Sequence, residues 1–270
     1  MSNRLGRQSV TFRVFLRASV PVLLTWCFIP LTFVLPLVDS TRAPYFDLTK
    51  DPAQFAYLLS QSGGKFGVPI ITILVLLVLI TRKKITFQRR WLETSVIVLI
   101  VLIFNGGGAL LNEHVLKARL KIPRPNIIWL AGENGGGPLG MSPDDFYSSG
   151  DKTTRHEILA HVLDKEPAPI LLSPSIENHW VEEMGYSFPS GHSFSAMFLA
   201  TFFLLSGATC ITTKRFWLFY ILLPWALAVC YSRPILRVHT PTDVTVGGLQ
   251  GLLVGFVAWA VFRALMRRFS

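Results

Sequence analysis

Three short segments carry the residue types that phosphate chemistry needs. Residues 117–125, KARLKIPRP, supply two cations, Lys117 and Arg124. The segment Pro-Ser-Gly-His ends at His192, directly before a long apolar run, and residues 232–243, SRPILRVHTPTD, hold a further arginine and a histidine four residues before an aspartate. Arginine binds oxyanions through paired hydrogen bonds, and an imidazole transfers protons or attacks as a nucleophile. Together these types could bind an oxyanion and carry out proton transfer or nucleophilic attack on it.

Each segment also has a purely structural interpretation. Pro123 and Pro125 stop a helix, which leaves Lys117 on its last turn and Arg124 in an extended segment, and positive charge at a helix C-terminus complements the dipole. Ser190 and Gly191 at a helix start leave backbone amides open to an anion, but a capped start beside an interfacial histidine has the same sequence. Asp243 is placed either to orient His239 or to complete a capping box with Thr240, and the spacing alone leaves both open.

The composition indicates the setting of these segments. The chain has 270 residues, 51% of them hydrophobic and only 16% charged, which is too apolar for an ordinary soluble domain. Apolar runs long enough for membrane helices occur at residues 18–38, 66–80, 96–116, 194–211, 216–231 and 244–265. We therefore predict an all-α, polytopic membrane protein with six transmembrane helices, forming one domain over residues 1–270.

The distribution of lysine and arginine predicts the orientation. Basic residues collect before the first run, in the segment TRKKITFQRR, at TKR and at the C-terminus, which all fall on one side of a six-helix chain. Because basic flanks stay in the cytoplasm, both termini are predicted to be cytoplasmic. These flanks explain the net charge of +10 and predict contact with anionic lipid, not with nucleic acid. The three segments then share the outer face, beneath a cap formed by residues 118–188 between helices 3 and 4.

The three segments match a known pattern. They have the forms KxxxxxxRP, PSGH and SRxxxxxHxxxD, complete and in order, and by these motifs the chain resembles the type 2 phosphatidic acid phosphatase (PAP2) superfamily. The outer stretches RPNIIWL and HWVEEMGYSFPSGH look closest to the bacterial phosphatidylglycerophosphatases within it. The resemblance covers residues 18–265.

The resemblance implies a role for each motif residue. His239 would be the nucleophile that forms a phosphohistidine, Asp243 would orient it, and His192 would protonate the leaving alkoxide and later activate water. The phosphoryl oxygens would be held by Lys117, Arg124, Ser190, Gly191 and Arg233. No cofactor or metal is expected, since cations and backbone amides can stabilise the transferring group and no cluster shows metal-ligand spacing. No obligate protein partner is inferred.

Arg237 departs from the family pattern. Family members commonly have glycine two residues before the nucleophilic histidine, so an arginine there adds a cation near the predicted pocket. We expect it either to favour diphosphate substrates or to extend toward lipid headgroups. Asn105 and Gly106 to Gly108 indicate a helix irregularity, and the stripe Gly247, Gly251 and Gly255 indicates close helix packing.

The resemblance predicts an integral membrane phosphatase acting on a phosphomonoester or diphosphate of a lipid. The candidate substrates are phosphatidylglycerol phosphate, undecaprenyl diphosphate, phosphatidic acid and lysophosphatidic acid, with the first favoured. In a bacterium the chain would lie in the inner membrane with its active site facing the periplasm. Two alternatives remain: a lipid phosphotransferase that uses the same histidine, and a non-catalytic lipid transporter or scaffold.

Overall fold

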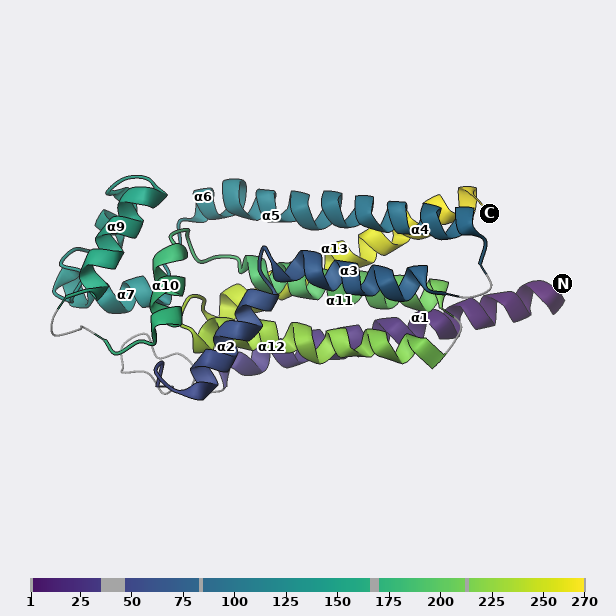
Figure 1. The fold of residues 1–270 in the computed structure, drawn as a ribbon, viewed down its shortest axis with the longest axis horizontal. Helices are drawn as coiled ribbons and strands as arrows, with labels where there is room; N and C mark the ends of the chain where they lie inside the picture. The colour runs from purple at the N-terminus through teal and green to yellow at the C-terminus, as the bar shows by residue number, and fades with distance from the viewer. Residues whose placement is uncertain (1, 35–46, 83–84, 166–169, 212–213, 270) are drawn as a thin grey trace.

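The computed structural model describes residues 2–34, 47–82, 85–165, 170–211 and 214–269, and these form helices without any strand. A bundle of long helices makes up most of the molecule, and a group of short helices caps one end of it (Figure 1). The two termini lie together at the opposite end of the bundle. The all-helical prediction is confirmed for the described residues.

Within the described residues, five helices are long and apolar enough to cross a membrane, and the number is six if a bent pair of helices counts as one span. The pair is α2 (Asp51–Ser62) and α3 (Gly67–Ile80), which meet at an angle of 66°. The other bundle helices are α1 (Ser2–Phe28), continued by a 3-10 turn (Ile29–Phe33), α4 (Phe87–Ile100), α5 (Gly107–Leu111), α6 (Lys117–Leu120), α11 (Gly191–Cys210), α12 (Leu222–Ile235) and α13 (Pro241–Arg268). The prediction of six spans therefore holds only with the bent pair included.

Several predicted boundaries need correction. The first helix begins well before residue 18, and its predicted end at Val38 lies outside the described residues. The outer segment before residue 66 is partly helical, because α2 precedes the bend. The third apolar run is one long rod in which α4, α5 and α6 are joined by two π-helical segments, Val101–Gly106 and Asn112–Leu116. The predicted irregularity at Asn105 is the first of these segments.

Helix α11 forms the centre of the bundle, with every residue from Ser193 to Gly207 buried. Helix α13 packs against it along the predicted glycine stripe. A Cβ atom on Gly247 would lie 2.4 Å from the carbonyl oxygen of Ser190, and one on Gly251 would lie 2.2 Å from that of Phe194. Only glycine allows backbones to approach so closely. These contacts of Gly247 and Gly251 with α11, called the glycine seam below, hold the starts of α11 and α13 side by side.

The cap has its own apolar core. Its helices are α7 (Pro125–Ala131), α8 (Pro143–Ser148), α9 (Lys152–Leu163) and α10 (Pro174–Glu182). Trp180 of α10 is fully buried and donates a hydrogen bond from Nε1 to the carbonyl oxygen of Leu236, 2.8 Å away. The cap is therefore joined to the loop between α12 and α13, which carries His239.

Candidate active site

His239 and Asp243 form a buried pair at the start of α13. Thr240 caps this helix, Pro241 is its first residue, and the capping box predicted for Thr240 and Asp243 is present. The Oδ2 atom of Asp243 accepts from the Thr240 amide at 2.8 Å and also lies 3.3 Å from Nδ1 of His239. The two interpretations of Asp243 are thus both correct, since one oxygen atom caps the helix and contacts the imidazole.

Ser187 completes the surroundings of this carboxylate. Its hydroxyl donates to Oδ2 of Asp243 and lies 3.3 Å from Nδ1 of His239. Ser187 is fully buried and is itself held by a backbone hydrogen bond to Ile122, at 2.8 Å. A serine two residues before the Pro-Ser-Gly-His motif gives no signal in the sequence, because only the path of the chain from the cap brings it here.

Arg124 identifies the tautomer of His239. Its Nη1 atom lies 3.3 Å from Nε2 of His239 and donates to the carbonyl oxygen of Val238 at 2.9 Å. Because a guanidinium has only donors, Nε2 presents its lone pair to Arg124, and the proton is on Nδ1, facing Asp243. Burial lowers the pKa of His239, and the positive charge of Arg124 lowers it further, whereas the hydrogen bond to Asp243 raises it. The neutral imidazole with a free lone pair on Nε2 is the nucleophilic form.

The Pro-Ser-Gly-His motif forms the N-terminus of α11. Ser190 is the N-cap and accepts from the Ser193 amide, and the helix begins at Gly191, so Pro189 precedes it and is not in its first turn. A Cβ atom on Gly191 would meet nothing within 4 Å, which leaves the first amides of the helix accessible. The ring of His192 faces the end of α2, where a Cβ on Gly64 would lie 3.0 Å from Nε2.

Two further predicted cations lie close to these groups. Lys117 is buried near the end of the long rod, with its amine 3.1 Å from a Glu113 carboxylate oxygen, and Glu113 also pairs with Lys152 of the cap. Arg233 is fully buried in the last turn of α12, where it donates to the hydroxyl of Ser60. All three predicted motifs therefore meet at the junction of bundle and cap.

Glu183 links two of these motifs. One carboxylate oxygen lies 2.7 Å from Nη2 of Arg124 and the other 2.7 Å from Nη2 of Arg233. Burial alone would raise the pKa of this carboxyl, but the two guanidinium groups hold it well below its ordinary value. A carboxylate therefore occupies the position between the two arginines where the motif pattern expects phosphoryl oxygens. The sequence analysis missed it, because a lone glutamate after an amphipathic helix is ordinary.

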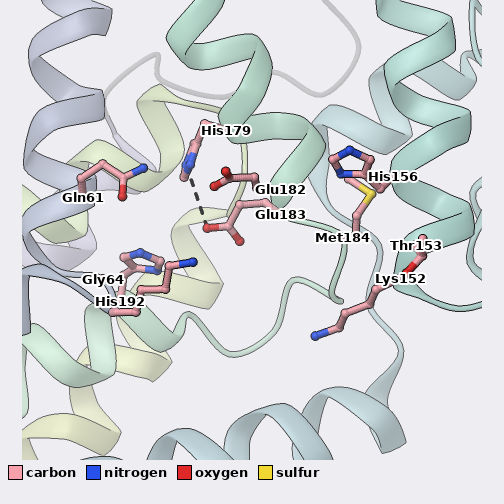
Figure 2. Close-up of a pocket in the computed structure, with 11 residues that line it drawn as sticks. Gln61, Gly64, Lys152, Thr153, His156, His179, Glu182, Glu183, Met184 and His192 are labelled. Atoms are coloured by element: carbon pink, nitrogen blue, oxygen red, sulfur yellow. Dashed lines mark ion pairs between the residues drawn. The ribbon is translucent and has the colours of Figure 1, made fainter.

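His179, one turn before Glu183 on α10, supports the same group. Its Nε2 atom lies 3.3 Å from Nη1 of Arg233 and 3.9 Å from Glu183. Burial lowers its pKa to about 4, and the charge of Arg233 adds to this. Figure 2 shows the Glu183 carboxylate between His179 and His192. His179 lies outside the three motifs, and it is buried against the site.

Two connected cavities surround these residues. The larger, of about 800 Å³, contains His192, His239, Lys117 and Arg124, and it continues along the bundle past Val68, Pro69, Ala109 and Leu110. The smaller, of about 640 Å³, lies under the cap and shares His192 and Glu183 with the first (Figure 2). The site is therefore a groove with a polar end at the cap and an apolar end between membrane helices. Among the described residues, no group of three His, Cys, Asp or Glu side chains is placed to hold a metal ion.

Arg237 lies apart from the groove. Its side chain is buried, its guanidinium carbon is 6.0 Å from the ring centroid of Trp129, and it does not line either cavity. Its φ of 60° falls in the left-handed region that favours glycine, which explains why the family pattern has glycine here. A selectivity role for Arg237 stays a prediction.

A family model described as the PAP2 superfamily matches residues 94–267, which include all three motifs. The chain belongs to this superfamily. It is 31% identical to the phosphatidylglycerophosphatase B of Escherichia coli (strain K12) over 149 residues, covering 55% of this chain and 54% of that protein. It is 28% identical to the phosphatidylglycerophosphatase B of Haemophilus influenzae over 214 residues, covering 77% of this chain and 80% of that protein. This PAP2 chain thus matches about half the length of the Escherichia coli relative.

Proposed function

We propose that this PAP2 protein is a membrane phosphatase that hydrolyses a phosphomonoester or diphosphate of a lipid through a phosphohistidine. The observation that carries the proposal is the state of His239, which lines the groove with its Nδ1 facing Asp243 and Ser187 and its unprotonated Nε2 beside Arg124. That state is the one a nucleophile needs, and the groove holds a second histidine, His192, and leads to an apolar end.

In the first step, Nε2 of His239 attacks the phosphorus and the bond from phosphorus to the lipid oxygen breaks. His192, in its protonated form, donates its proton to that oxygen, so the lipid leaves as an alcohol, or as a lipid monophosphate if the substrate is a diphosphate. The Nδ1 proton stays on His239, where Asp243 stabilises the positive charge that forms on the ring.

In the second step, a water molecule attacks the phosphorus of the phosphohistidine. His192, now neutral, takes a proton from the water while the bond from phosphorus to Nε2 breaks. Orthophosphate leaves, and His239 returns to its neutral form. His192 thus acts first as an acid and then as a base, so the two steps need no second acid or base from the protein.

The charge of the transferring group would be stabilised by Lys117, Arg124, Arg233 and the first amides of α11, since phosphoryl transfer depends mainly on positioning and electrostatics. Because Glu183 holds both arginines at 2.7 Å, the phosphoryl oxygens must take over contacts that Glu183 makes in the unliganded protein. We expect no requirement for a divalent metal.

The leading substrate is phosphatidylglycerol phosphate, because the relatives carry the name phosphatidylglycerophosphatase B. Undecaprenyl diphosphate and phosphatidic acid are the other candidates. The cap lies at the end of the bundle opposite the termini (Figure 1), so cytoplasmic termini would place the site at the periplasmic face of the inner membrane. Labelling of single cysteines at Gly136 and Arg268 by an impermeant reagent would test this, and labelling of the second alone in intact cells would contradict it.

The decisive experiment measures phosphate release by the purified protein from a panel of lipid phosphates in detergent with excess chelator. We expect wild-type activity, and losses of about 10²-fold to 10⁴-fold in the separate variants His239→Ala and His192→Ala. Acid-labile, base-stable labelling of the protein by a radioactive substrate, absent from His239→Ala, would identify the phosphohistidine. Folded variants with full activity, or strict dependence on added metal, would refute the proposal.

A further inference from the structure

The side chain of Asn112 lines the groove beside its apolar residues, and behind it lies a second amide, that of Gln250. Asn112 lines the large cavity and is 1% exposed, and its Oδ1 atom accepts from Nε2 of Gln250 on α13 at 2.7 Å. The other halves of the two amides, Nδ2 of Asn112 and Oε1 of Gln250, are buried without a hydrogen-bond partner. A buried donor without a partner is costly and rare in native proteins, so Nδ2 of Asn112 lacks an acceptor that a ligand can provide.

The helix carrying Asn112 is shaped for contact with a ligand at this place. Asn112 begins one of the two π-helical segments of the rod, and such segments occur frequently at functional sites. The other contains Asn105, which also lines the cavity, and a Cβ on the adjacent Gly106 would meet nothing within 4 Å. The groove is therefore open along this face of the rod.

The position of Asn112 relative to the phosphate site indicates which part of a lipid it meets. It precedes Lys117 by five residues, or roughly 7 Å along a helix, in the direction of the apolar lining. In a diacylglycerol phosphate the ester carbonyl groups, which accept hydrogen bonds, lie one glycerol unit from the phosphate that is cleaved, whereas in phosphatidylglycerol phosphate a phosphodiester and a second glycerol lie between them. A polyprenyl chain has only hydrocarbon at that depth.

We infer that Asn112, held by Gln250, is a subsite that donates a hydrogen bond to an ester carbonyl of a diacylglycerol phosphate and so selects this substrate over hydrocarbon-chain phosphates. This inference rests on the proposed function and makes its substrate class specific. Asn112 takes no part in the phosphoryl transfer itself.

The test compares two substrates that differ only in these carbonyls: a diacylglycerol phosphate and the dialkyl ether lipid with the same chains. Both are presented in a detergent without ester groups, so that no bulk lipid competes. The wild type should prefer the diester by about threefold to tenfold in kcat/KM, the range that one hydrogen bond gives. Asn112→Leu should reduce this preference to about one.

The double variant Asn112→Leu with Gln250→Leu guards against misfolding, because replacing both partners of a buried hydrogen bond by apolar groups is often nearly neutral. Ser206→Ala is the matched control, since its hydroxyl is also buried without a partner but does not line the groove. It should keep the wild-type preference.

A wild-type ratio near one, or a ratio unchanged in both Asn112 variants, would overturn the inference. If the wild type hydrolysed no lipid phosphate, the proposed function would fail instead. The ratio of the affinities for the diester and the diether lipid, measured by displacement of a fluorescent lipid from the groove, would then still decide whether Asn112 donates a hydrogen bond to the carbonyl.

Discussion

Replacing Glu183 by glutamine should destabilise the unliganded protein and strengthen phosphate binding. The substitution removes the charge that links Arg124 and Arg233 but keeps the size of the side chain. Two guanidinium groups, 2% and 0% exposed, would lose their anionic partner. Orthophosphate would then be the anion best placed to neutralise them.

The magnitude follows from the burial of the three groups. Removing one partner of a buried ion pair costs about 3 to 5 kcal/mol, and the remaining amide oxygen favours the lower end, about 3 kcal/mol. For a chain of this size that lowers the melting temperature by roughly 6 to 12 °C. Like charges within a few ångströms repel by up to about 4 kcal/mol at an effective dielectric constant near 20. If phosphate relieves a third of this repulsion between the arginines, its binding strengthens about tenfold.

The assay is thermal unfolding in detergent, followed by tryptophan fluorescence over a series of orthophosphate concentrations. Glu182→Gln is the matched control, because Glu182 is adjacent and exposed. We expect phosphate to raise the melting temperature of Glu183→Gln far more than that of the wild type or the control. Equal stabilisation of all three would refute the idea that carboxylate and phosphate compete for the same arginines.

Four further outcomes are expected. Asp243→Asn keeps the helix cap but loses the charge beside the imidazole, so kcat should fall about 10²-fold to 10⁴-fold while the melting temperature changes little. Ser187→Ala should lower kcat about tenfold with KM unchanged in steady-state assays, and Ser187→Thr should restore part of it. Gly64→Ala places a methyl group 3.0 Å from Nε2 of His192 and should lower kcat about tenfold, whereas Gly107→Ala, with nothing within 4 Å, should not. The pKa of His179 is about 4 in the folded protein against 6.5 for an ordinary histidine, so between pH 4 and pH 6.5 the unfolded chain binds more protons than the folded one. The contribution of neutral His179 to the free energy of unfolding is therefore fully present above about pH 6.5 and is lost, by at most about 3 kcal/mol, as the pH falls toward 4. Unfolding measured against pH should show a smaller loss in His179→Gln.

The sequence was sufficient for the parts of the fold that depend on local chemistry. Apolar runs predicted the bundle, and the Thr240 to Asp243 spacing predicted a capping box that is present. The bend between α2 and α3 was not predicted, because the polar composition of α2 is that of an outer loop. Boundaries at π-helical segments were also missed, since these depend on packing rather than periodicity.

The motif residues of the candidate site were predictable because each motif keeps its own spacing. Glu183 and Ser187 were not, since they reach the site only through the path of the chain from the cap back to α11. Neither lies in a recognisable pattern, and each is defined by groups distant in sequence: Arg124 and Arg233 for one, Asp243 for the other. Arg237 lies two residues before His239 in the sequence, and its guanidinium carbon lies 6.0 Å from the ring centroid of Trp129, so its role in selectivity stays a prediction.

The glycine seam between α11 and α13 has a consequence for how the chemistry is divided between parts of the molecule. His192 begins one of these helices and His239 directly precedes the other, so the proposed acid and nucleophile belong to a single rigid unit, whereas Arg124 and Glu183 come from the cap side. A side chain larger than hydrogen at Gly251 would have to separate the two helices, because its Cβ would lie 2.2 Å from a carbonyl oxygen. The spacing of the two histidines is thus determined inside the hydrocarbon region, by a residue that touches neither of them.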